Sequence, residues 1–294
     1  MFQGIYHGSR AHAPDMTSVL LRAKSVGLSG ILATSTNLAD FQENMKLIEE
    51  YSKCNVNIKT TLGVHPTSCA QVAKTNNISE YFAQMKAVFQ TRPTNLIAVG
   101  ECGIDYARLK WSPKELQNEF FDRHFELTEA FKLPMFLHMR ECANDFMSIM
   151  RRNREKYYGG VVHSFTGTVE EAKEILEFSE DTFIGLNGCS LREPHSIEVV
   201  KSLPIERIMI ESDAPWCEMR PTHASAPFLS DFSWSIGRAV NKEKYQESLP
   251  VRGRNEPSES RRVLHVISKL KNIEEEELAE IIFENTTKLF PQLE

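Results

Sequence analysis

The sequence predicts an α/β fold, a TIM (β/α)8 barrel that forms one domain over residues 1–294. Short runs rich in Val, Ile and Leu alternate with longer amphipathic stretches, which is typical of strand–helix units around a parallel sheet. No internal repeat, linker or low-complexity segment divides the chain. We therefore expect parallel strands inside and helices outside.

Seven apolar runs are the expected strands, at residues 30–35, 58–65, 96–101, 134–138, 160–164, 182–187 and 207–212. Between them lie amphipathic stretches with apolar residues at helical spacing, such as residues 113–132, and residues 274–290 form a closing helix. A closed barrel of this type has eight units, so the first strand is missing or degenerate. Free strand edges would open the core, and we expect residues 1–10 or a neighbouring chain to fill part of the gap.

One long segment lacks a periodic pattern. Residues 217–257 contain several prolines and little sustained periodicity, and loops of this length are uncommon unless they are functional. The segment follows the last expected strand. We therefore expect it to lie over the mouth of the barrel, where substrate-binding loops sit.

Composition restricts the class of protein. The chain is 41% hydrophobic and 25% charged, with a net charge of -6, which argues against coating nucleic acid by bulk electrostatics. A nuclease is still compatible, because bound cations present positive charge locally. The six cysteines form no close pair, and no signal core or membrane-length apolar run occurs. We expect a soluble protein of the cytoplasm or nucleus with reduced thiols and no membrane partner; no pattern indicates an oligomeric state.

Four polar residues stand at or just after the ends of expected strands: Glu101, His138, His163 and Asp213. The carboxyl ends of barrel strands converge on one face, so these side chains are expected to share a site. A single histidine there is more often structural. Four such residues together form a mixed nitrogen and oxygen ligand set for Mg²⁺, Mn²⁺ or Zn²⁺.

Two further features have competing interpretations. Cys102 follows Glu101 and invites a nucleophile assignment, but packing is the preferred interpretation because metal-assisted hydrolysis needs no thiol. The basic run at residues 151–158 has the composition of a DNA-backbone patch with stacking tyrosines. The solvated end of a helix is the default interpretation of that run.

Six short motifs occur in series along nearly the whole chain: GVHP (63–66), GECGIDY (100–106), PMFLHMR (134–140), VVHSFTGT (161–168), ESDAPW (211–216) and RNEP (254–257). In this order they closely resemble the TatD family of metal-dependent DNases. FQGIYHG, GGVVHSFTGT and NGCSL make the sequence most similar to the eukaryotic TatD domain-containing proteins.

The resemblance implies a barrel hydrolase that binds one or two divalent cations and cuts DNA, with 3′-to-5′ exonuclease activity. Mg²⁺ is the first expectation, with Mn²⁺ or Zn²⁺ as alternatives. Glu101 would bridge two metals and act in catalysis, and His138 and His163 would bind one of them. Asp213 would bind the other metal and is the candidate general base.

Three other residues are candidates for substrate binding. His65 in GVHP stands at a strand end, with a structural role as the alternative. Arg140 could donate a bidentate pair to phosphate or form a salt bridge at the barrel rim. Glu256 in RNEP matches a family motif, with a plain turn as the alternative.

The sequence departs from the family at its start, where the first strand with a short polar motif is absent. Either the natural chain begins further upstream or the barrel closes without this strand. Two other functions stay open beside the DNase: a related metal hydrolase of a non-DNA ester or amide, and a binding protein that has lost turnover.

Overall fold

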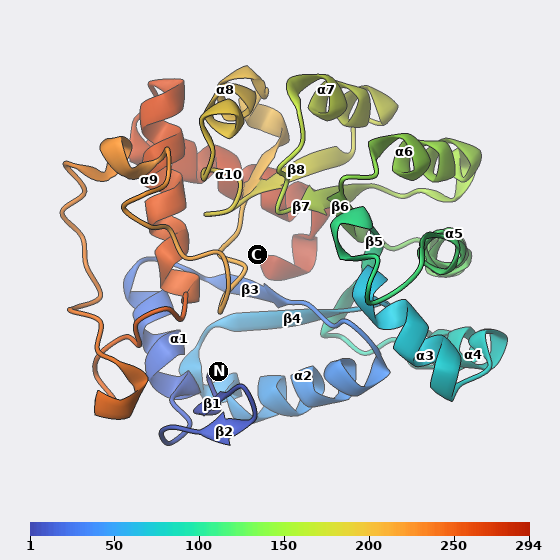
Figure 1. The fold of residues 1–294 in the computed structure, drawn as a ribbon, viewed down its shortest axis with the longest axis horizontal. Helices are drawn as coiled ribbons and strands as arrows, with labels where there is room; N and C mark the ends of the chain where they lie inside the picture. The colour runs from blue at the N-terminus through green and yellow to red at the C-terminus, as the bar shows by residue number, and fades with distance from the viewer.

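The computed structural model describes residues 1–294 and contains one curled sheet of seven parallel strands in the order β3-β4-β5-β6-β7-β8-β9 (Figure 1). The strands are β3 (Gly30–Ala33), β4 (Asn57–Leu62), β5 (Leu96–Asp105), β6 (Met135–Arg140), β7 (Gly160–His163), β8 (Thr182–Leu186) and β9 (Ile208–Ile210). All seven expected strands are confirmed. β5 is longer than expected because its ladder with β6 continues to Asp105.

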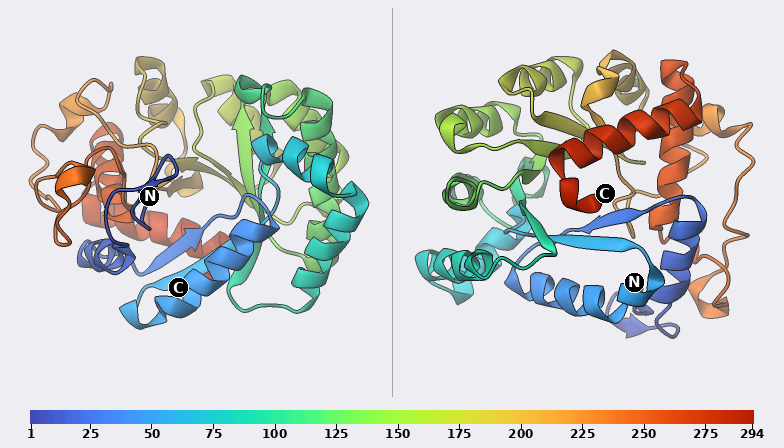
Figure 2. Two further views of the ribbon diagram at one scale, coloured as in Figure 1. Left: turned by 60° about the horizontal axis from the view of Figure 1, so that its bottom comes forward. Right: turned by 180° about the vertical axis from the view of Figure 1, so that it is seen from behind.

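Ten helices accompany the strands: α1 (Met16–Ser25), α2 (Leu38–Glu50), α3 (Cys69–Thr75), α4 (Ile78–Gln90), α5 (Lys114–Phe131), α6 (Ala143–Arg152), α7 (Val169–Phe178), α8 (Pro194–Ser202), α9 (Ser260–Lys271) and α10 (Glu275–Leu289). They surround the sheet on the outside, as a barrel of strand–helix units requires (Figures 1 and 2). Phe121, Phe125 and Phe146 pack where α5 and α6 cover the strands, and each is fully buried.

The sheet does not close, because β3 and β9 are its two edges and pair with β4 and β8 only. The carboxy-terminal residues cover one end of the opening. Asn57 on β4 donates to the carbonyl of Gln292 at 2.8 Å, and Leu293 packs in a buried cluster with side chains from β5 to β9. Figure 2 shows α10 and this terminus crossing the far side of the barrel. An open cavity of about 340 Å³ lies between β3, β9, α9 and α10.

Residues 1–10 do not enter the sheet, which corrects the expectation that they fill its gap. They form a small antiparallel hairpin, β1 (Ile5–Tyr6) with β2 (Ser9–Arg10), whose strands pair only with each other. Gly4 and Gly8 both have positive φ, so the chain turns back instead of extending along a strand edge.

The segment of residues 217–257 is irregular, as expected, with two short 3₁₀ turns and one isolated bridge. It contacts the amino-terminal residues: the ring of Tyr245 stacks on His12 at 4.1 Å, and Arg254 lies over Phe2. No helix combines the length and hydropathy needed to cross a membrane.

Candidate metal centre

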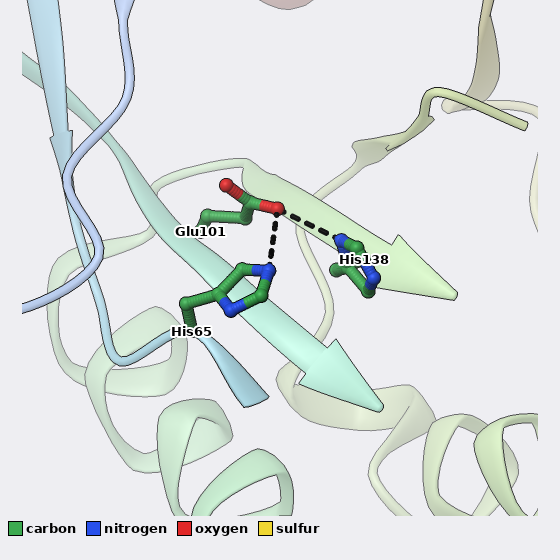
Figure 3. Close-up of side chains that lie close together, drawn as sticks. All are labelled: His65, Glu101 and His138. Atoms are coloured by element: carbon green, nitrogen blue, oxygen red, sulfur yellow. Dashed lines mark hydrogen bonds and ion pairs between the residues drawn. The ribbon is translucent and has the colours of Figure 1, made fainter. Parts of the chain in front are cut away.

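One oxygen of Glu101 lies among three histidines at the carboxyl end of the sheet. Its Oε1 is 2.9 Å from Nδ1 of His138, 2.8 Å from Nε2 of His163 and 3.3 Å from Nε2 of His65. Figure 3 shows His65 and His138 both pointing at this oxygen. The structure thus brings together three members of the predicted quartet and adds His65 to them.

The strand register explains this convergence. β5, β6 and β7 are neighbours, and His138 pairs directly with His163 across β6 and β7. A shift in register between Gly100 and Cys102 marks the position of Glu101 on β5. Gly103, with φ +142°, allows β5 to approach β6 closely, because a Cβ atom there would lie 2.0 Å from the His138 carbonyl oxygen.

At the centre, burial and the neighbouring charges shift the pKa values in opposite directions, and the neighbouring charges dominate. Burial raises the pKa of Glu101, but the charges of His163 and His65 and hydrogen bonds from His138 and His163 hold that pKa well below its usual range. Burial likewise lowers the pKa of His163, yet the nearby Glu101 carboxylate outweighs it and raises that pKa well above normal. The carboxylate is therefore ionised, and the imidazoles are strongly attracted to it.

Two carboxylates that sequence reasoning missed lie behind the histidines: Asp105, which is fully buried, and Glu211, which is partly buried. Asp105 Oδ2 is 3.3 Å from Nε2 of His138, and Glu211 Oε2 is 3.5 Å from Nδ1 of His163. Asp105 closes the GECGID run and Glu211 opens ESDAPW, so each lay inside a motif already singled out. The other oxygen of each carboxylate, Asp105 Oδ1 and Glu211 Oε1, is buried without a hydrogen-bond partner.

Asp213 follows β9 at the same end of the sheet but makes no direct hydrogen bond to the three histidines. Burial raises the pKa of Asp213, and the nearby charge of His163 lowers it in part. Its Oδ2 accepts from the Cys217 thiol at 3.1 Å. The Cys217 sulfur in turn lies 2.7 Å from that of Cys189, and both cysteines are free thiols.

The other predicted residues, Arg140 and Glu256, make no hydrogen bond to the Glu101 cluster. Arg140 ends β6 with an exposed side chain. Glu256 is held elsewhere: Arg22 donates to its two oxygens at 2.7 and 2.9 Å, and Arg254 donates at 3.0 Å. This buried carboxylate joins α1 to the end of the irregular segment, so it is not brought to the histidines.

Cys102 and the basic run at residues 151–158 each have the surroundings expected from their structural interpretation. Cys102 is fully buried in the core, where burial raises the pKa of its thiol. In the basic run, Arg152 pairs with Asp122 at 2.9 Å and Arg151 pairs with Glu174, while Tyr157 is buried. The run is the solvated end of a helix, in which Tyr157 is buried and Tyr158 is exposed.

The donor set fits a divalent cation. Ligand atoms of His65, Glu101 and His138 all lie within 4.8 Å of one another, and His163 contacts the same Glu101 oxygen. Imidazole nitrogens and a carboxylate are ligands that divalent metals take in proteins, and the unpartnered buried oxygens behind them need compensating positive charge.

Comparison with known proteins gives a consistent result. The family model described as TatD related DNase matches residues 7–291. A protein of Schizosaccharomyces pombe named deoxyribonuclease Tat-D is 35% identical over 98% of this chain and 91% of its own length. A Shigella flexneri protein named 3′-5′ ssDNA/RNA exonuclease TatD is 34% identical over 72% of this chain and 78% of its own length.

Solved structures agree with the sequence comparison. The chain is similar to a hydrolase TatD family protein from Entamoeba histolytica, with a TM-score of 0.90 and 33% identity over 98% of this chain and 93% of that one. A Saccharomyces cerevisiae structure described as an uncharacterized amidohydrolase gives a TM-score of 0.87 and 29% identity, over 99% of this chain and 96% of that one.

Proposed function

The chain belongs to the family of TatD-related DNases, and on this premise we propose that it is a divalent-metal-dependent deoxyribonuclease that removes nucleotides from the 3′ end of DNA. The observation that carries the proposal is the single Glu101 oxygen within 3.3 Å of three histidine nitrogens. Such a cluster of polar side chains is better explained by a bound cation than by a structural role in the protein core.

In this proposal Glu101, His138 and His163 hold the cation, with His65 beside them at the substrate side. When bound, a divalent cation neutralises charge on a phosphodiester and makes water more acidic. Asp213 accepts the proton of the water that attacks phosphorus, and the bond from phosphorus to the leaving 3′ oxygen breaks. Burial raises the pKa of Asp213 toward neutral pH, and a general base works best when its pKa lies near the pH of the reaction.

Arg140 is proposed to bind the substrate phosphate. It stands two residues beyond His138 on the same strand, and its exposed guanidinium can donate two parallel hydrogen bonds to phosphate oxygens. The proposed cation is Mn²⁺, Zn²⁺ or Mg²⁺. Imidazole nitrogens suit Zn²⁺ better than Mg²⁺ or Mn²⁺, which prefer oxygen ligands such as the Glu101 carboxylate.

The test is a nuclease assay on single- and double-stranded DNA labelled at either end, with each of the three ions or a chelator. We expect metal-dependent loss of nucleotides from the 3′ end. Glu101→Gln and Asp213→Asn should each lose activity by at least about 100-fold, the size typical of removing a general base. Asp122→Asn, at the surface between α5 and α6, is the control and should be fully active.

Two results would overturn the proposal. One is cleavage that continues unchanged in chelator. The other is full activity in Glu101→Gln or Asp213→Asn while their folding is normal by circular dichroism. Cleavage of esters or amides without any cleavage of DNA would assign the centre to a different substrate.

A further inference from the structure

The two histidines that are proposed to bind metal each lie between two carboxylates. In His138, Nδ1 faces Glu101 and Nε2 faces Asp105. In His163 the order of the ring atoms is reversed: Nε2 faces Glu101 and Nδ1 faces Glu211. One nitrogen of each ring is thus directed to the centre and the other to a second carboxylate behind it.

Asp105 is fixed in place by its own strand and by α5. Its side chain is fully buried, and its backbone N–H donates to Oε1 of Gln117 at 2.8 Å. The amide nitrogen of Gln117 donates back to the Asp105 carbonyl at 3.1 Å. This reciprocal pair of bonds holds the backbone of the last residue of β5 beside His138.

Glu211 is fixed just as firmly at the other ring. The Ser164 backbone N–H donates to its Oε2 at 3.1 Å, and Asn187 donates to the same oxygen at 3.4 Å. Gly185 makes room for this carboxylate, because a Cβ atom at that position would lie 2.0 Å from Glu211 Oε1. The surroundings of Glu211 therefore have room for a side chain of this length and offer a hydrogen-bond donor to its oxygen.

We propose that Asp105 and Glu211 are positioning residues that determine which ring nitrogen each histidine presents to the metal: Nδ1 in His138 and Nε2 in His163. The proposal rests on the metal-dependent function proposed above. A carboxylate can only accept a hydrogen bond, so it keeps the proton on the nitrogen that faces it. Once Glu101 binds the cation it no longer competes for the proton, and the ring nitrogen that faces the centre keeps a free lone pair for the metal.

Replacing these carboxylates by amides should weaken metal binding while preserving shape. An amide can donate as well as accept, so Asp105→Asn and Glu211→Gln also stabilise the tautomer whose proton sits on the metal-facing nitrogen. Loss of a carboxylate behind a metal-bound histidine typically costs about 10- to 100-fold in affinity. We expect at least about a tenfold increase in the Kd for Mn²⁺ in each variant.

The experiment is calorimetric titration of the full chain with Mn²⁺, supported by the visible absorption spectrum with Co²⁺. Glu275→Gln is the matched control, because Glu275 on α10 also accepts from a buried histidine, His265 on α9, at 2.6 Å, and neither residue belongs to the proposed centre. We expect wild-type affinity in this control and a changed Co²⁺ spectrum only in Asp105→Asn and Glu211→Gln. A merely structural role would lower thermal stability in chelator without moving the spectrum.

A second measurement needs no variant and covers the case in which one fails to fold. In wild-type protein with ¹⁵N-labelled histidine and bound Zn²⁺, ring protons should be found on Nε2 of His138 and Nδ1 of His163. The opposite protonation pattern would overturn the inference. So would Mn²⁺ affinities in both amide variants within about twofold of the control, well under the expected loss. Mn²⁺ binding without DNA cleavage would reject the nuclease proposal alone.

Discussion

His124 on α5 offers a quantitative test of the packing that supports the centre. The ring is fully buried, its Nε2 accepts the backbone N–H of Val64 at 3.0 Å, and its Nδ1–H donates to the Phe120 carbonyl at 2.6 Å. The Val64 bond anchors the chain one residue before His65. Burial lowers the pKa of His124 from 6.5 to about 4, so the folded protein requires the neutral ring.

The sign and size of the effect follow from this pKa. Between about pH 4 and 6.5 the unfolded chain binds a proton at His124 that the folded chain refuses, so stability falls as the pH falls through this range. The contribution is complete above 6.5. A gap of about 2.5 pH units at about 1.36 kcal/mol each corresponds to about 3 kcal/mol lost by pH 4.

The assay is urea unfolding at pH values from 4 to 7.5 for the wild type and His124→Gln, which cannot titrate. Other groups affect both proteins alike, so the difference in unfolding free energy isolates His124. That difference should shrink by about 3 kcal/mol on acidification, because only the wild type carries the titrating ring at position 124. His195→Gln, at an exposed position on α8, is the control. A difference that stays constant across the range would refute the burial argument.

Three further predictions concern single substitutions. Asp15→Ala breaks two 2.6 Å bonds to the fully buried Arg254 and should lower the unfolding free energy by about 3 kcal/mol in urea, whereas a loss below about 1 kcal/mol would contradict the buried pair. Phe121→Ala empties a fully buried core position and should cost about 4 kcal/mol; near-native thermal stability would show that the core collapses around the cavity. Gly185→Ala pushes a Cβ atom into Glu211 and should raise the Mn²⁺ Kd by about tenfold, and calorimetry with an unchanged Kd would show that this carboxylate moves freely.

The sequence was sufficient to locate the centre because parallel topology turns strand ends into neighbours. Glu101, His138 and His163 were identified as polar residues at the ends of apolar runs, and the structure places them within hydrogen-bond distance of one another. Asp213 remains a predicted ligand. It lies at the same end of the sheet, but only its electrostatic influence on the centre is evident.

The residues behind the histidines could not be predicted in the same way. Asp105 lies beyond the strand expected at residues 96–101, and nothing in the pattern showed that β5 would continue to it. Glu211 lies in the same motif as Asp213, and only Asp213 was selected there as a candidate ligand. Glu256 shows the opposite difficulty, because its partner Arg22 lies 234 residues away and only the fold reveals the pair.

The number of strands was predictable from the sequence, but the residues that cover the opening between β3 and β9 were not. Seven apolar runs gave seven strands, and β3 and β9 are left as edges. The sequence offered residues 1–10 as the nearest substitute, yet their two glycines favour a hairpin. Leu293, at the far end of the chain, packs into the opening instead, which periodicity within a single segment cannot reveal.

The charge of the centre reconciles an acidic chain with an anionic substrate. Glu101, Asp105, Glu211 and Asp213 place four carboxylates around three imidazoles, in a chain whose net charge is already -6. Phosphate would be repelled from such a group unless positive charge is present within it. Protonated histidines cannot be the source of that charge in the metal-bound protein, because a ring protonated on both nitrogens has no lone pair for a metal. The carboxylates therefore favour a cation at the centre, and the cation, rather than a basic surface, would attract the phosphodiester.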